Sequence, residues 1–321
     1  MERNPSMTEE EWRWFLLGRE ARNLSAADIE KLEAQLQMDP SNMDLRIQVF
    51  SYFIQYERNN LKHENADKKL FEHALWLIEN KASVTGLLGH RLAVTGAAVK
   101  PKTFAALRQA WLEQISNAPT NPAILGNAAS FIVWKDLETA SDLFERAYAI
   151  QPNATWLGTL IIHCNAELWG APNLYKNKIR ERIVDIGTRS LKTEQDGAPF
   201  LTCEYVCDAA LDLGRLETAL WSAEILGNMG GLDLLQRSKA YMGLVALRSD
   251  DRDRAIELLD ELNHPYPSMF RLATELFEAG ERDCVISLIR RFGRRIKKSA
   301  RERWLEQIAN DEPPDFRDYC C

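Results

Sequence analysis

The sequence lacks features that would anchor it in a membrane or cross-link it covalently. Its longest apolar stretch, residues 155–162, is far shorter than the roughly 20 residues that span a bilayer. Six cysteines in 321 residues are too few for the disulfide framework of a small secreted domain. Residues 1–11 are polar and acidic, without the apolar region of a signal peptide. We therefore expect a soluble, cytoplasmic protein.

Motifs of common catalytic and nucleotide-binding sites are also missing. The sequence has no Gly-x-Ser-x-Gly, no phosphate-binding loop, no His-Glu-x-x-His and no dinucleotide-binding fingerprint. Its acidic pair Asp250-Asp251 falls at a predicted helix start, where negative charge favours the helix dipole. A net charge of −7 disfavours general binding to nucleic acid. We expect a non-enzymatic protein without a cofactor.

A metal site is also not expected. Cys203 and Cys207 are one helical turn apart and could face a common metal together with His163 and Cys164. Cysteine within a helical pattern is, however, more often a small buried apolar residue. We therefore interpret these cysteines as core residues.

No segment shows the alternation of a β-strand, whereas apolar residues recur at helical spacing through most of the chain. Thr8 and Glu11 form a predicted capping box, Ser25 is predicted to open a second helix because its hydroxyl can accept free N–H groups, and Pro101 stands at the first turn of a further predicted helix. Near the N-terminus the predicted apolar face is Trp12, Phe15 and Leu16. The pattern predicts an all-α fold, with helices over residues 42–58, 65–80, 83–96 and 101–117.

Residues 121–152 contain a helix–turn–helix pattern that returns further along the chain. Small residues stand at equivalent positions of the second helices, where two backbones must approach closely, and a proline closes the unit. The small residues are Ala140, Ala219 and Ala255, and their first-helix partners are Ala128, Cys207 and Gly243. A fourth copy carries Val285 at the small position.

This pattern resembles the tetratricopeptide repeat (TPR), and the chain is similar to bacterial-type helical-repeat proteins. The resemblance covers residues 121–152 and 199–292 best, and extends to 42–117. It implies a right-handed α-solenoid of antiparallel helix pairs. We expect N-terminal capping helices at 1–40, irregular TPR-like pairs at 41–120, repeats at 121–296 with an insertion near 169–178, a C-terminal capping helix at 297–310, and a flexible acidic tail at 311–321.

The resemblance also implies where a ligand would bind, because TPR solenoids bind mainly through the first helices of their pairs. A groove of this kind would mix apolar anchors with acidic and basic stretches, which suits an extended or helical peptide. The expected function is a protein-binding scaffold or adaptor. The groove residues implied by the repeat are Leu125, Ile132, Glu204, Asp208, Asp212, Arg237, Leu244, Arg248, Phe270, Thr274 and Phe277.

Three alternatives remain open at the level of sequence. The terminal pair Cys320-Cys321 resembles a double lipidation signal, which would make the protein a membrane-anchored or tail-modified adaptor. The protein could be a regulatory subunit of an enzyme. Residues 290–303 form a basic cluster that could hold phosphate, nucleic acid or the chain's own acidic tail. For this cluster we favour a solvated face of the last helix, so nucleic acid is not the expected partner.

Overall fold

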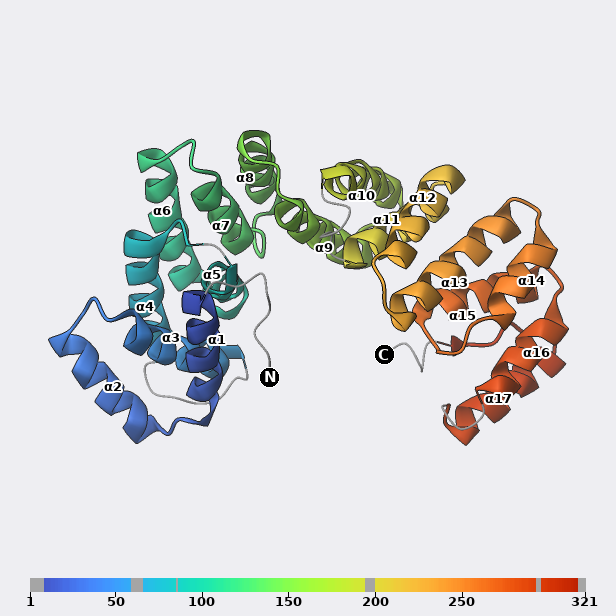
Figure 1. Ribbon diagram of the computed structural model, residues 1–321, viewed down its shortest axis with the longest axis horizontal. Helices are drawn as coiled ribbons and strands as arrows, with labels where there is room; N and C mark the ends of the chain where they lie inside the picture. Colours follow the sequence, from blue (N-terminus) through green and yellow to red (C-terminus); the bar gives the residue numbers. More distant parts are fainter. Residues whose placement is uncertain (1–8, 59–65, 85, 194–199, 293–295, 317–321) are drawn as a thin grey trace. The chain divides into compact units, whose positions relative to one another are not determined.

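The computed structural model describes residues 9–58, 66–84, 86–193, 200–292 and 296–316. Within these ranges every regular element is a helix and no strand occurs (Figure 1). The predicted all-α class is therefore confirmed. The chain divides into two compact units, residues 1–152 and 153–321, each with its own buried core.

The first unit begins with helices whose starts follow from local sequence signals. Ser25 accepts a hydrogen bond from the backbone N–H of Asp28 at 3.2 Å, and Asp28 accepts one from the backbone of Ser25 at 3.1 Å. The reciprocal pair is a capping box, and it stands at the helix start that the sequence predicts at Ser25. The predicted capping box at Thr8 falls on a residue outside the described part. The helices are α1 (Glu9–Glu20), a 3-10 turn (Ala21–Asn23), α2 (Ala26–Met38), α3 (Met43–Arg58), α4 (Ala66–Lys81), α5 (Gly86–Ala98), α6 (Pro101–Asn117), α7 (Pro122–Ile132) and α8 (Leu137–Ile150).

The buried face of α1 differs from the predicted one. Trp14 is only 6% exposed, whereas Trp12 and Phe15 stack on each other at 5.2 Å and stay partly exposed. Leu16 is exposed. The prediction was wrong because residues 12–17 carry apolar side chains on every side of the helix, so spacing alone does not select the face that packs against α3 and α5.

In the second unit, each helix packs on the helix that follows it in the sequence. Residues 169–178, where the sequence predicts an insertion, lie at the end of α9 and the start of α10. They lengthen two neighbouring helices, which are joined by a short turn at residues 171 and 172. The helices are α9 (Ala154–Gly170), α10 (Asn173–Thr193), α11 (Phe200–Asp212), α12 (Leu216–Asn228), α13 (Leu232–Arg248), α14 (Arg252–Asp260), α15 (Pro267–Glu278), α16 (Arg282–Arg291) and α17 (Lys298–Ala309).

Close packing occurs at the small positions of the repeating pattern. Ala140, Ala219 and Ala255 are fully buried. The thiol of Cys207 donates to the carbonyl of Ala219 at 3.5 Å, which places α11 directly on α12. A Cβ at Gly243 on α13 would lie 3.6 Å from Leu258 Cβ on α14 and 2.6 Å from Leu272 Cδ2 on α15, so both helices come close to α13 at this glycine. The predicted close approach of helix backbones is thus confirmed at these positions.

The start of the predicted free tail is packed against the second unit. Phe316 is buried, with its ring 4.6 Å from that of Phe270 and 4.8 Å from that of Trp304. The indole nitrogen of Trp304 donates to the carbonyl of Asp315 at 2.7 Å. Residues 311–316, which the sequence predicts to be a flexible tail, thus lie against the helices, where Phe316 covers apolar surface that α15 and α17 would otherwise expose. Cys320 and Cys321 lie outside the described residues.

Candidate functional site

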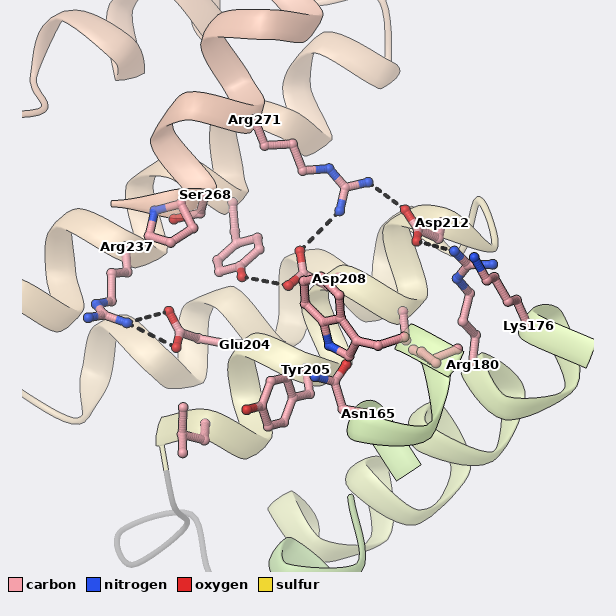
Figure 2. A pocket seen from close by; sticks show the side chains of 16 residues that line it. Asn165, Lys176, Arg180, Glu204, Tyr205, Asp208, Asp212, Arg237, Ser268 and Arg271 are labelled. Atoms are coloured by element: carbon pink, nitrogen blue, oxygen red, sulfur yellow. Dashed lines mark hydrogen bonds and ion pairs between the residues drawn. The ribbon is translucent and has the colours of Figure 1, made fainter. Parts of the chain in front are cut away.

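The second unit contains a cavity of about 760 Å³ lined by side chains of α9, α10, α11, α13 and α15 (Figure 2). Most of the charged side chains that line it lie on α11, α13 and α15, which are the first helices of the predicted helix pairs. Leu168, Trp169 and Leu201 add apolar surface. The cavity therefore combines a charged wall with an apolar part, and its volume falls in the usual range of ligand sites.

Arg271 on α15 is the centre of the charged wall. Its Nη1 donates to Asp208 at 3.0 Å and its Nη2 to Asp212 at 2.6 Å (Figure 2). Its Nε donates to Glu275 at 3.2 Å. Arg180 on α10 pairs with the second oxygen of Asp212 at 2.8 Å. One guanidinium group thus joins α11 and α15, and a second one joins α10 to the same carboxylate.

A separate ion pair lies at the other side of the cavity. Arg237 Nη1 on α13 is 2.8 Å and 3.0 Å from the two carboxylate oxygens of Glu204 on α11. The guanidinium also lies over the ring of Tyr266, 4.6 Å from its centre. Both contacts fix the planar group in one orientation, so the charges at this side are arranged before any ligand arrives.

Burial changes the proton affinities of the groups in the cavity. Burial raises the pKa of Asp208 to about 6, although the contacts with Arg271 and Tyr241 act in the opposite direction. Burial would lower the pKa of Arg271, but Asp208 and Asp212 raise it above its ordinary value. Burial and the carboxylates of Glu204 and Asp208 raise the pKa of Tyr205. Asp208 therefore holds a proton more readily than an ordinary aspartate does, while Arg271 stays charged.

Several polar groups of the cavity are not engaged by the protein. Lys176 on α10 and Asn165 on α9 make no hydrogen bond or ion pair with any described residue. Trp169 is 88% exposed, although it lines the cavity. These groups are available to a ligand, whereas the carboxylates are already matched by cations.

Some of the predicted groove residues meet in this cavity. Glu204, Asp208, Asp212 and Arg237 all line it. Arg248 lies further along α13, where it binds Glu275 through two nitrogens at 2.8 and 2.6 Å.

Other predicted groove residues lie elsewhere. Phe270 and Thr274 line a neighbouring hollow of about 420 Å³, which residues 313–316 help to close. Leu244 and Phe277 are buried in the core of the second unit. Leu125 and Ile132 are fully buried and belong to the first unit, so the structure does not bring them to this cavity. Their apolar side chains pack between helices.

Sequence reasoning missed Trp169, Lys176, Arg180, Tyr241 and Arg271. Trp169 and Lys176 fall in the segment 169–178 that the sequence predicts to be an insertion, and Arg180 lies just beyond it. Arg271 could have been found, because it lies one repeat length after Arg237, which was selected. The contacts also recur at a regular spacing: Glu204 pairs with Arg237, Asp208 with Tyr241 and Asp233 with Tyr266, each 33 residues apart.

The basic segment 290–303 is partly used inside the fold. Arg291 donates to the carbonyl of Leu262 at 3.2 Å and to the side chain of Asp260 at 2.5 Å, next to the C-terminal end of α14. Phe292 and Ile296 are buried. Asp311 of the tail pairs with Arg282, which precedes the basic segment. Residues 293–295 lie outside the described part.

The buried cysteines are unreactive in character. Burial raises the pKa of Cys164 to about 11 and that of Cys203 to about 12. The thiol of Cys207 is fully buried, and its pKa is well above the ordinary value. Across the described residues, no group of three or more His, Cys, Asp or Glu side chains is arranged to hold a metal ion.

The comparisons with known proteins give no family assignment. No protein-family model matches the sequence, and no match is found among curated proteins. Among the helices that the structure describes, none combines the length and the apolar character needed to cross a membrane.

Proposed function

We propose that the protein is a TPR-like helical-repeat scaffold whose second unit binds a polypeptide segment of a partner in the 760 Å³ cavity. The observation that carries the proposal is the composition of the walls. Most of them come from α11, α13 and α15, the first helices of the predicted pairs, which the repeat resemblance assigns to the binding face, while α9 and α10 add the exposed Trp169 and two cations.

The arrangement of the charged groups supports a binding role. Glu204, Asp208 and Asp212 are held by guanidinium groups from other helices, so the wall is fixed before a ligand binds. A preorganised site loses less conformational entropy on binding than a flexible one. Exposed tryptophan is also the side chain that most often contributes strongly to protein–protein affinity.

Selection from a library of displayed random peptides, with the full chain as bait, tests this proposal. Peptides that bind in the cavity should lose about tenfold or more in affinity with Trp169→Ala, because the indole supplies apolar contact area. Leu174→Ala is the matched control, because Leu174 is 85% exposed nearby but does not line the cavity. Failure to enrich any peptide, or enriched peptides that bind both variants equally well, would refute the proposal.

A role in catalysis is the second candidate, favoured by one observation. Groups with raised pKa gather in the cavity, namely Asp208, Tyr205 and Tyr241. Clusters of this kind occur at active sites as well as in structural ion-pair networks. Assays with chromogenic ester, phosphate and glycoside substrates test it. Turnover by the wild-type chain that disappears with Asp208→Asn would support catalysis, whereas no turnover of any substrate would count against it.

A further inference from the structure

Around the cavity every carboxylate is paired with a cation of the protein, and one of the cations has no such partner among the described residues. Glu204 is held by Arg237, and Asp208 by Arg271. Asp212 is shared by Arg271 and Arg180, while Glu275 receives two hydrogen bonds from Arg248. Each carboxylate thus has a guanidinium partner within the protein. Lys176 is the cation left over among the described groups that line the cavity.

The position of Lys176 makes it accessible to a ligand. It is half-buried on α10, one helical turn before Arg180, and both side chains extend toward the Asp212 side of the cavity (Figure 2). Three cations, Lys176, Arg180 and Arg271, therefore surround the carboxylates of Asp208 and Asp212. The excess positive charge lies on this side, whereas Glu204 and Arg237 balance each other on the other side. A half-buried cation without a partner favours an anion more strongly than a fully exposed one does.

Apolar surface lies next to this cation. Trp169 and Leu168 line the same cavity from the end of α9, and the indole is almost entirely solvent-exposed. A ligand group that covers the indole gains contact area at low entropic cost, because tryptophan has few rotatable bonds. The cavity thus offers an anion-binding group and an apolar platform together.

A segment of the chain itself lies beside this cavity and is held on α15 by one aromatic side chain. The acidic residues 311–316 are fixed by burial of Phe316 against Phe270 and by the pairing of Asp311 with Arg282. The hollow beneath this segment and the large cavity share Pro267 and Arg271. The edge of α15 next to the cavity thus already holds an aromatic side chain, and the acidic residue of the same segment pairs with an arginine of α16.

From these observations we infer that the partner segment is acidic and carries an aromatic or large aliphatic residue. Its carboxylate pairs with Lys176, and its apolar side chain packs on Trp169. This inference rests on the proposed function and specifies its ligand class. The three carboxylates that line the cavity would by themselves suggest a basic peptide as the ligand. The inference predicts an acidic one instead, because those carboxylates are already paired with arginines.

Two labelled peptides of about 12 residues test the inference by fluorescence anisotropy with the full chain. One carries a tryptophan flanked by Asp and Glu, and in the other each acidic residue is replaced by Lys. We expect the acidic peptide to bind more tightly, with an affinity that falls as salt increases from about 50 to 200 mM. Lys176→Glu should weaken its binding about tenfold, because attraction becomes repulsion. The same variant should bind the Lys peptide more tightly than the wild-type chain does.

Lys178→Glu is the matched control for Lys176→Glu. It changes the net charge of the chain by the same amount and lies on the same helix, but Lys178 lines a different hollow. Its effect on the acidic peptide should be less than about twofold at moderate salt. Circular dichroism checks that both variants keep the helix content of the wild type.

The possible outcomes separate the inference from the proposed function. If the Lys peptide binds as tightly as the acidic one and Trp169→Ala weakens both, the cavity binds peptides but the acidic ligand class is wrong. Equal effects of Lys176→Glu and Lys178→Glu would also overturn the inference. If neither these peptides nor the random library yields binding that depends on Trp169, the proposed function fails as well.

Discussion

Arg271 donates a hydrogen bond to Asp208 at 3.0 Å although 63 residues separate the two along the chain. The contact connects α15 with α11, and α13 packs on both of these helices. Tyr241 on α13 donates to the other oxygen of Asp208 at 3.2 Å. The carboxylate of Asp208 is therefore a common acceptor for α13 and α15.

Replacing Arg271 should destabilise the second unit. In Arg271→Met the carboxylates of Asp208, Asp212 and Glu275 lose a shared donor. We therefore expect the free energy of unfolding to fall by roughly 1–3 kcal/mol. Urea unfolding followed by circular dichroism measures the change. Arg254→Met is the control, because Arg254 forms one exposed pair with Glu257 and should lose less than about 0.5 kcal/mol. Equal losses in the two variants would show that the Arg271 contacts add nothing to stability.

The raised pKa of Asp208 should give a pH dependence of stability with a defined sign. Between the ordinary pKa of aspartate and about 6, the folded state holds this proton more often than the unfolded state does. The contribution of Asp208 to the free energy of unfolding therefore decreases as pH rises through this window and is constant above it. Asp208→Asn should remove the dependence, which appears as the difference between the two stability–pH curves. The opposite slope would mean that pairing with Arg271 outweighs burial.

Gly187 on α10 should not tolerate a side chain. A Cβ there would lie 2.1 Å from Val206 Cγ2 on α11, and valine cannot move its methyl group easily. We expect Gly187→Ala to cost about 1–3 kcal/mol of stability, despite the better helix propensity of alanine. Gly170→Ala is the control at the end of α9, where no atom lies within 4 Å of an added Cβ. Thermal unfolding of the two variants decides the point, and equal midpoints would contradict the close approach of α10 and α11.

Removing the ring of Phe316 should free residues 311–316 from the surface of α15 and α17. In Phe316→Ala the contacts with Phe270 and Trp304 are lost, and the local cost is of the order of 3 kcal/mol. The indole N–H of Trp304, which donates to Asp315, should then exchange with solvent much faster. Nuclear magnetic resonance of the indole signals measures this rate. Asp311→Asn serves as the control, since it weakens one exposed ion pair, and unchanged exchange in Phe316→Ala would show that the segment is held in another way.

Sequence spacing predicted the helices well where each helix has one apolar face. The predicted helix 101–117 coincides with α6, and the helix start predicted at Ser25 is the N-cap of α2. Spacing failed for α1, where Trp12, Trp14 and Phe15 allow more than one buried face. The choice among them depends on the surfaces of α3 and α5, which no local pattern specifies.

Only those residues of the candidate site that follow the repeat pattern could be predicted from the sequence. Glu204 and Arg237 were found because the repeat places them on alternate helices, and their ion pair lies in the cavity. Trp169 and Lys176 were missed because they belong to lengthened helices that interrupt the repeat. The docking of Phe316 was missed for a related reason, since a single aromatic residue in a polar tail carries no periodic signal.

Two kinds of contact determine how the second unit unfolds. The pairs Glu204–Arg237, Asp208–Tyr241 and Asp233–Tyr266, each 33 residues apart, join neighbouring helix pairs. Contacts between neighbouring helix pairs alone would let the array open from one end, one pair at a time. Arg271 reaches past the neighbouring pair to Asp208, so α15 cannot separate without also disturbing α11. Helices α11 to α15 should therefore share one free energy of opening in hydrogen exchange, which makes the walls of the cavity a single cooperative block.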